Sequence, residues 1–259
     1  MYEKGQVLCM LSTLLQTNNQ KVEVIIMYKY KISCSGGKDS VASVILWYVY
    51  HKDLIPETEV VFYEPMFDKN VSGLLDEQYK HIYNTLIPKF NNWGFKCTVV
   101  KSNITYVESY THIITRSKVL ERNGKMRGGL ISGLCVFTSN KQRTLEKYNP
   151  SAMDIVGIAY DEYKRYKRMN AKQYSILYQH EFTENDAYNL CESYGLLSPH
   201  YTNGNKRDGC WFCPNQLRTG FDTQHHRDLL YKLWYENKGK TVNDKCIYKM
   251  TFTELFEKF

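Results

Sequence analysis

The stretch KISCSGGKDSVASVIL, residues 31–46, joins an apolar run to a helical pattern through a turn rich in glycine and serine. Residues 29–35 predict a strand, and residues 39–53 predict a helix because their apolar side chains recur at helical spacing. A glycine-rich turn in this position aims backbone N–H groups and the helix N-terminus at one point. The sequence therefore predicts an anion-binding site at the turn.

The turn differs from a Walker A loop, the phosphate loop of many ATPases. That loop needs a glycine five positions before its Gly-Lys pair, and a serine or threonine directly after the lysine. Ile32 and Asp39 occupy these two positions. A phosphate loop of another kind is indicated; the alternative is a strand-to-helix turn capped by serine.

Strand and helix patterns alternate along the rest of the chain, which indicates a parallel sheet with right-handed crossovers. Further strands are predicted at 58–68, 95–102 and 152–160, and helices at 74–92, 183–195 and within 222–238. We divide the chain into a peripheral extension (1–28), an α/β nucleotide-binding domain (29–180) and a C-terminal helical subregion with a cysteine-bound metal (181–259). A later translation start, at Met27, is an alternative to Met1.

The charge balance favours partners that carry phosphate or sulfate. The 259 residues include 34 Lys+Arg and 27 Asp+Glu, a formal net charge of +7. This excess does not choose between nucleotides and nucleic acid. Residues 121–133 hold four glycines and three basic side chains and predict a mobile basic loop.

The sequence predicts a cytoplasmic protein without membrane contact. Residues 8–15 are mostly apolar, but a signal-peptide cleavage pattern does not follow them. No apolar stretch reaches the roughly 18 residues of a membrane-spanning helix. In that compartment the eight cysteines are expected to be thiols or metal ligands rather than disulfides.

The sequence SGGKDS at residues 35–40 resembles the pyrophosphate loop of the ATP pyrophosphatase superfamily, which includes the phosphoadenosine phosphosulfate reductase family. Further segments follow in the order typical of that family's phage-type and uncharacterised bacterial members. They are VVFYEPMFD (60–68), NVSGLLDEQYKHI (70–82), IVGIAYDEYKRYKRM (155–169) and GCWFCP (209–214). The resemblance implies a Rossmann-like sheet of the adenine nucleotide α-hydrolase type, with helices on both faces.

The resemblance also implies roles for individual residues. The residues implied in nucleotide binding are Ser33, Ser35, Gly36, Gly37, Lys38, Asp39, Ser40, Gly157 and Ile158. Lys38, Asp39, Arg165 and Arg168 are in addition candidate catalytic residues. Arg165 and Arg168 are candidates for a second anion contact, because residues three apart on a helix share a face and arginine binds phosphate bidentately. The alternative for this basic segment is a solvated helix face.

A metal site is predicted from the cysteines. The spacing of Cys210 and Cys213 lets two thiolates bind one metal, although a redox pair has the same spacing. Cys191 and Cys135 are the candidate further ligands. Cys191 could instead be a core residue, because it lies on an apolar helical stripe. The four thiolates suit Zn²⁺ or a [4Fe–4S] cluster, and the resemblance favours the cluster.

The chemistry that the resemblance implies is cleavage of ATP, or of a nucleotide like phosphoadenosine phosphosulfate, next to the α-phosphate. Mg²⁺ would offset the developing charge. The activated acceptor, nucleic acid or a small molecule, would then receive sulfur or nitrogen, with a sulfur donor protein as a further partner. Reduction of a sulfonucleotide is an alternative, but Cys246 lacks the Glu-Cys-Gly-x-His context of the family's nucleophile. The second alternative is a module that binds a nucleotide or nucleic acid without catalysing a reaction.

Overall fold

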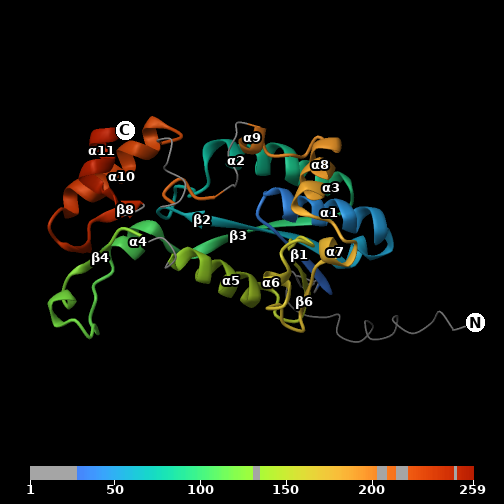
Figure 1. The fold of residues 1–259 in the computed structure, drawn as a ribbon, viewed down its shortest axis with the longest axis horizontal. Helices are drawn as coiled ribbons and strands as arrows, with labels where there is room; N and C mark the ends of the chain where they lie inside the picture. Colours follow the sequence, from blue (N-terminus) through green and yellow to red (C-terminus); the bar gives the residue numbers. More distant parts are fainter. Residues whose placement is uncertain (1–27, 131–134, 203–208, 214–220, 248–249) are drawn as a thin grey trace, which may run out of the picture.

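The computed structural model describes residues 28–130, 135–202, 209–213, 221–247 and 250–259. Its centre is a parallel five-stranded sheet in the order β3-β2-β1-β5-β6 (Figure 1). These strands are β1 (Tyr30–Cys34), β2 (Thr58–Met66), β3 (Lys96–Thr105), β5 (Met153–Ile155) and β6 (Gln173–Tyr174). The predicted α/β, Rossmann-like, mostly parallel fold is confirmed. The predicted N-terminal extension, apart from Tyr28, lies outside the described residues.

The sheet is buried because helices cover both of its faces. All nine residues of β2 are buried, as expected of a parallel strand that is apolar on both sides. One face carries α1 (Lys38–Tyr50), η1 (Lys52–Glu57), α2 (Asp76–His81), η2 (Ile82–Leu86), α3 (Ile87–Asn92), α7 (Ile176–Gln179) and α8 (Glu184–Ser193). The helix predicted at 74–92 is thus one helical run, α2 to α3, with a π-helical segment in the middle.

The opposite face is covered by α5 (Val136–Tyr148), which packs on β2 and β3. The buried Lys31 of β1 joins the two layers, because its ammonium donates to Leu145 O of α5 at 2.6 Å. The short helix α6 (Tyr163–Tyr166) lies beyond the end of α5 (Figure 1). The helix α5 therefore covers this face of the sheet and is bonded to β1 through Lys31.

The strand order creates a crevice between β1 and β5. From β1 the chain proceeds outward through β2 to β3, whereas β5 and β6 lie on the other side of β1. Ligands of open parallel sheets bind outside the carboxyl ends of the strands at such a reversal of order. The turn at residues 35–40 follows β1 at this point.

A second cluster of buried aromatic residues forms the C-terminal part of the molecule. Phe67, Tyr106, Trp211, Trp234 and Phe252 are each at most 5% exposed and pack in this cluster. The elements in and around it are α4 (Tyr106–Thr111), β4 (Met126–Gly128), α10 (Gln224–Asn237), β7 (Thr241–Asn243), β8 (Lys245–Ile247), β9 (Met250–Thr251) and α11 (Phe252–Lys258). The short helix η3 (Leu120–Arg122) lies between α4 and β4 in the chain, and α9 (Pro199–Thr202) packs instead against α2. From the sequence we placed residues 181–259, which include helix α8, in the C-terminal subregion. In the structure α8 packs against α1 of the nucleotide-binding part. No described helix has the length and apolarity needed to cross a membrane.

Candidate functional site

The turn after β1 is held in shape by its own residues. Ser40 Oγ donates to Gly37 O at 2.8 Å and accepts from Ser35 N at 3.1 Å. Gly36 has a φ of +81°, and a Cβ on it would lie 2.9 Å from Ile82 Cγ1. A residue other than glycine would therefore be strained there and would also meet Ile82.

The N-terminus of α1 has backbone N–H groups to offer a ligand. Gly37 is its N-cap and provides no side chain to bind them. Among the described residues, two N–H groups of the turn have only long contacts, Lys38 N to Tyr201 Oη and Gly37 N to Ser35 Oγ, each at 3.4 Å. The first N–H groups of a helix lack intrahelical partners and lie at its positive end. The turn can therefore bind an anion such as a phosphate.

Gly157 allows a second segment to approach this turn. The strand predicted at 152–160 is a strand only over β5, Met153–Ile155, and the chain then runs beside the first turn of α1. A Cβ on Gly157 would lie 2.8 Å from both Asp39 C and Ser40 N. Side chains essentially never come so close to backbone, so only glycine fits.

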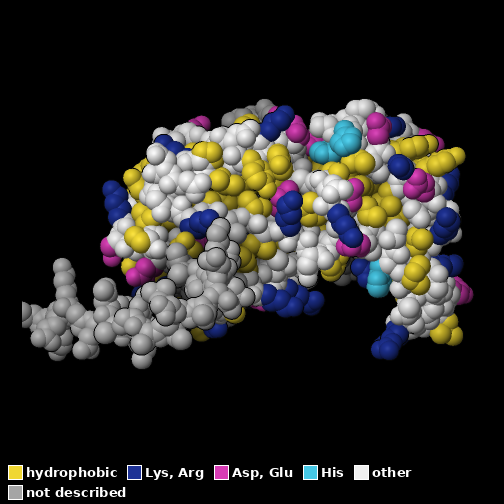
Figure 2. All heavy atoms as spheres, turned by 180° about the vertical axis from the view of Figure 1, so that it is seen from behind, with side chains coloured by type: hydrophobic (Ala, Val, Ile, Leu, Met, Phe, Trp, Pro, Cys, Tyr) yellow, Lys and Arg dark blue, Asp and Glu magenta, His cyan; other side chains and the backbone are white. Residues whose placement is uncertain are grey.

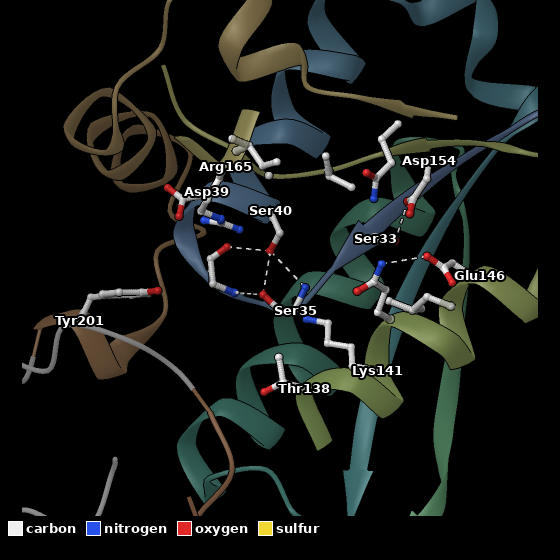
Figure 3. A pocket seen from close by; sticks show the side chains of 17 residues that line it. Ser33, Ser35, Asp39, Ser40, Thr138, Lys141, Glu146, Asp154, Arg165 and Tyr201 are labelled. Carbon is white, nitrogen blue, oxygen red and sulfur yellow. Dashed lines mark hydrogen bonds between the residues drawn. The ribbon is translucent and has the colours of Figure 1, made fainter. Parts of the chain in front are cut away.

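A cavity of about 490 Å³ opens above the turn and the end of β5 (Figure 3). This volume is in the range of small-ligand sites. The wall includes most of the residues implied in nucleotide binding, namely Ser33, Ser35, Gly37, Asp39, Ser40, Gly157 and Ile158. Gly36 lies behind the turn, beside Ile82. The structure thus brings two distant segments of the sequence to one cavity.

Lys38 does not line this cavity. Its ammonium lies 2.8 Å from both Asp39 Oδ1 and Glu184 Oε2, and only 13% of its side chain is exposed. Burial lowers the pKa of Lys38, but the hydrogen bonds to Asp39 and Glu184, together with the negative charges of these two carboxylates, outweigh burial and raise the pKa overall. Burial also raises the pKa of Asp39, which the Lys38 ammonium partly counteracts. In this arrangement Lys38 positions Asp39 and ties α1 to α8.

Lys141 is a cation of the cavity that the sequence reasoning missed. It lies on α5, and its side chain extends toward Ser35 (Figure 3). Burial lowers its pKa, against the opposing influence of Cys34 and Cys210. Thr138, Lys141, Gln142 and Leu145 have the i, i+3, i+4, i+7 spacing of one helix face, and all of them line the cavity. From the sequence, this spacing could have shown that the four side chains share one face of a helix. It could not have shown that this face lies beside the distant phosphate loop.

The two candidate arginines, Arg165 and Arg168, lie in different places. Arg165 lines the cavity and pairs with the Glu162 carboxylate. Arg168 is absent from the cavity wall, and its Nε donates to Lys164 O at 3.1 Å. The shared face expected for them requires a helix through both residues, but α6 ends at Tyr166. Of the pair, only Arg165 is placed to contact an anion in this cavity.

Hydrogen-bond acceptors line the far end of the cavity. Ser33 Oγ donates to Asp154 Oδ1 at 2.6 Å, and Asp154 and Glu146 both line the wall (Figure 3). Burial raises the pKa of Asp154, and the bond from Ser33 acts in the opposite direction. Carboxylates accept hydrogen bonds from hydroxyl and amino groups. This end can therefore bind the nucleoside part of a ligand whose phosphates lie at the turn.

Three of the four candidate metal ligands lie in one region. Cys135 precedes α5, and Cys210 pairs with Leu74 in an isolated bridge. Burial raises the pKa of the Cys210 thiol, and the thiols of Cys213 and Cys135 raise it further. Among the described residues, however, no three or more His, Cys, Asp or Glu side chains are grouped closely enough to hold a metal ion. The described thiols therefore do not form a ready-made site for Zn²⁺ or a [4Fe–4S] cluster.

Cys191 lies away from these three. It is buried on α8, in the core shared with α1, and its Sγ donates to Lys38 O at 3.2 Å. Burial raises its pKa to about 12. Cys191 is therefore a core residue, which was the alternative indicated by the apolar stripe on its helix. It does not lie with the other three predicted metal ligands.

We expect Cys191→Ala to leave the iron and zinc content of the purified protein unchanged, because its thiol is enclosed by protein at the back of the loop. Plasma mass spectrometry of anaerobically purified protein, with a visible absorption spectrum, measures this. Cys210→Ala is the matched comparison from the other cysteine region. Loss of metal in Cys191→Ala with a normal unfolding curve would return Cys191 to the ligand set.

The sheet order and the cavity define an α/β Rossmann-like protein with a ligand site at the reversal of strand order. No known protein family and no curated protein matches the sequence. Among solved structures, the chain is similar to the U34-tRNA thiolase NcsA from Methanococcus maripaludis with its [4Fe-4S] cluster. The identity is 14% and the TM-score 0.40, over 86% of this chain and 76% of that one. The resemblance to the phosphoadenosine phosphosulfate reductase branch remains a prediction.

Proposed function

We propose that this chain is an enzyme that binds ATP or a related adenine nucleotide and cleaves it next to the α-phosphate, releasing pyrophosphate. The observation that carries the proposal is the cavity over the SGGKDS turn, where the N-terminus of α1 meets the cations Lys141 and Arg165. A helix N-terminus and two cations from other elements make a site for several phosphate charges. The acceptors at the opposite end suit a nucleoside.

In this proposal an acceptor oxygen attacks the α-phosphorus, the bond from the α-phosphorus to the bridging oxygen breaks, and pyrophosphate leaves with the electron pair. The N–H groups of Gly37 and Lys38 bind the departing phosphates. Lys141 and Arg165 stabilise the charge that develops on them. The adenylated acceptor is then open to displacement by sulfur or nitrogen.

Asp39 is the residue of the turn suited to hold Mg²⁺. Its carboxylate lines the cavity, and Oδ1 is fixed by Lys38. Magnesium in nucleotide sites is typically bound by one or two carboxylates together with phosphate oxygens. The ion, when bound, would neutralise charge on the leaving phosphates.

The alternative of sulfonucleotide reduction needs a thiol nucleophile at the nucleotide. None of the six cysteines whose side chains the structure describes lines the cavity. Cys246 belongs to β8, and its side chain lies outside the described part. The six described cysteines therefore supply no nucleophile for reduction at this cavity.

The test is to incubate the protein with ATP, Mg²⁺ and candidate acceptors and to measure pyrophosphate. We expect release with ATP and none with the α,β-methylene analogue, whose bond next to the α-phosphate is not cleaved. Phosphate release without pyrophosphate would contradict the proposal. Tight ATP binding without turnover with any acceptor would favour the binding-module alternative, and sulfite release from phosphoadenosine phosphosulfate, lost in Cys246→Ser, would favour reduction.

A further inference from the structure

Residues 112–127 form an arm that projects from the C-terminal part of the molecule (Figures 1 and 2). Its two sides run antiparallel, with Ile113 opposite Met126. Backbone bonds close the ribbon: Arg127 N to His112 O at 2.9 Å, Ile114 N to Lys125 O at 2.9 Å and Gly124 N to Ile114 O at 2.8 Å. The basic loop predicted at 121–133 is therefore, up to residue 127, one side of a bonded two-stranded arm.

The end of the arm is also internally bonded. Asn123 Oδ1 accepts from Ser117 N at 2.8 Å, which closes the tip across six residues. At its base, β4 pairs with β7, and a Cβ on Gly128 would lie only 2.1 Å from Asn243 O. Because both ends are fixed, the arm presents its side chains in a defined arrangement.

The arm carries a concentrated positive charge. Between residues 115 and 125 it has four cations, Arg116, Lys118, Arg122 and Lys125, and a single acid, Glu121. All four cations are exposed, and within the described part of the chain none of them takes part in an ion pair. Unpaired cations gathered on one projection form a binding surface for a polyanion.

The tip between these cations is apolar. Leu120 is 80% exposed and Val119 is 47% exposed. Side chains of this kind at the end of a basic ribbon can contact the methyl groups of thymine in a groove, while the cations reach the phosphates on either side. The major groove of B-form DNA is about 12 Å wide and admits a two-stranded ribbon, whereas that of A-form RNA is too narrow for side chains to read.

We propose that residues 112–127 bind double-stranded DNA through its major groove, with the four cations on the phosphates and Val119 and Leu120 on the base edges. The proposal deepens the proposed function, in which nucleic acid is one candidate acceptor. A role of the bound DNA as acceptor rests on the proposed function, whereas DNA binding by the arm does not. Acceptor DNA held by the arm would lie on the side of the molecule where α5 leads to the cavity.

The test measures fluorescence anisotropy of a labelled 20-base-pair DNA duplex over a range of salt concentrations. The combined variant Arg116→Gln, Lys118→Gln, Arg122→Gln and Lys125→Gln should weaken binding at least about tenfold and reduce the salt slope by about 0.9 for each phosphate that the arm no longer neutralises. The uncharged change Leu120→Ser should weaken binding without altering the slope. Nucleotide affinity should be unchanged in both variants, which distinguishes failure of this proposal from failure of the proposed function.

The matched control removes the same charge outside the arm, by changing the exposed Lys52, Lys89, Lys96 and Lys172 to glutamine; within the described part of the chain none of these four takes part in an ion pair. An equal loss of affinity in this control would overturn the proposal, since net charge alone would then explain it. Stronger binding to single-stranded DNA, to duplex RNA or to anionic lipid vesicles than to the DNA duplex would overturn it as well.

Discussion

Lys141→Met should lower nucleotide affinity and pyrophosphate release by about 100- to 1000-fold, equivalent to about 3–4 kcal/mol. The ammonium approaches the phosphate loop from α5, opposite the N-terminus of α1, and lies in a partly buried site where electrostatic interactions are strong. Isothermal titration calorimetry with ATP, together with a pyrophosphate assay, measures both effects. Lys147→Met, on the exposed surface of the same helix, is the control and should have no effect.

The same variant separates function from structure. Burial lowers the pKa of Lys141, so the charged form is less stable in the folded protein than in the unfolded chain. Removing the charge should therefore leave the free energy of unfolding at neutral pH unchanged or increase it. A loss of stability together with the loss of binding would instead indicate that Lys141 serves the packing of α5.

The pH dependence has a definite sign. A lysine with a lowered pKa loses its proton, and with it its attraction for phosphate, at a lower pH than an ordinary lysine, whose pKa is about 10.4. Nucleotide affinity should therefore begin to fall at a pH below the pKa of an ordinary lysine, as Lys141 loses its proton. This fall should be absent in Lys141→Met. An identical alkaline decline in the two proteins would assign it to another group.

The loop and the sheet were predictable from the sequence because their signals are local. The turn of residues 35–40 lies between a strand pattern and a helix pattern, and the structure has β1 and α1 there. Thr183 and Asp186 form the capping box that starts α8, within the predicted helix. These features depend on neighbours within a few residues, and the chain folds accordingly.

The composition of the cavity depended on contacts that the sequence does not contain. Lys141 lines the cavity because α5 packs on β2 and β3, and this packing brings its side chain to a loop about 100 positions earlier in the chain. Arg168 leaves it because α6 stops at Tyr166, before the face it was expected to share with Arg165. Cys191 joins the core because its helix packs on α1 instead of on the other cysteines. The positions of Lys141, Arg168 and Cys191 thus depend on where helices end and on which elements they pack against.

Gly157→Ala should reduce nucleotide affinity by at least about 100-fold, because it displaces the turn that binds the phosphates. Its new Cβ would lie 2.8 Å from Asp39 C and Ser40 N, which are backbone atoms that cannot rotate away. Relief requires α1 to move, but Val41, Val44 and Ile45 anchor this helix in the core at 0% exposure. Shifts of about 1 Å at a binding site can cost about 100-fold. Calorimetric titration with ATP measures the effect.

The control for Gly157→Ala must separate displacement of the loop from general destabilisation. Overpacking at Gly157 should cost about 1–3 kcal/mol of unfolding free energy. Gly239→Ala has a cost of similar size for another reason, since Gly239 has a φ of +79° but open space where the Cβ would go. Because Gly239 lies far from the turn in the sequence and outside the cavity wall, its variant should bind nucleotide normally. Normal nucleotide affinity in Gly157→Ala would show that phosphates bind without the close approach of this segment, and would remove the residues after β5 from the site.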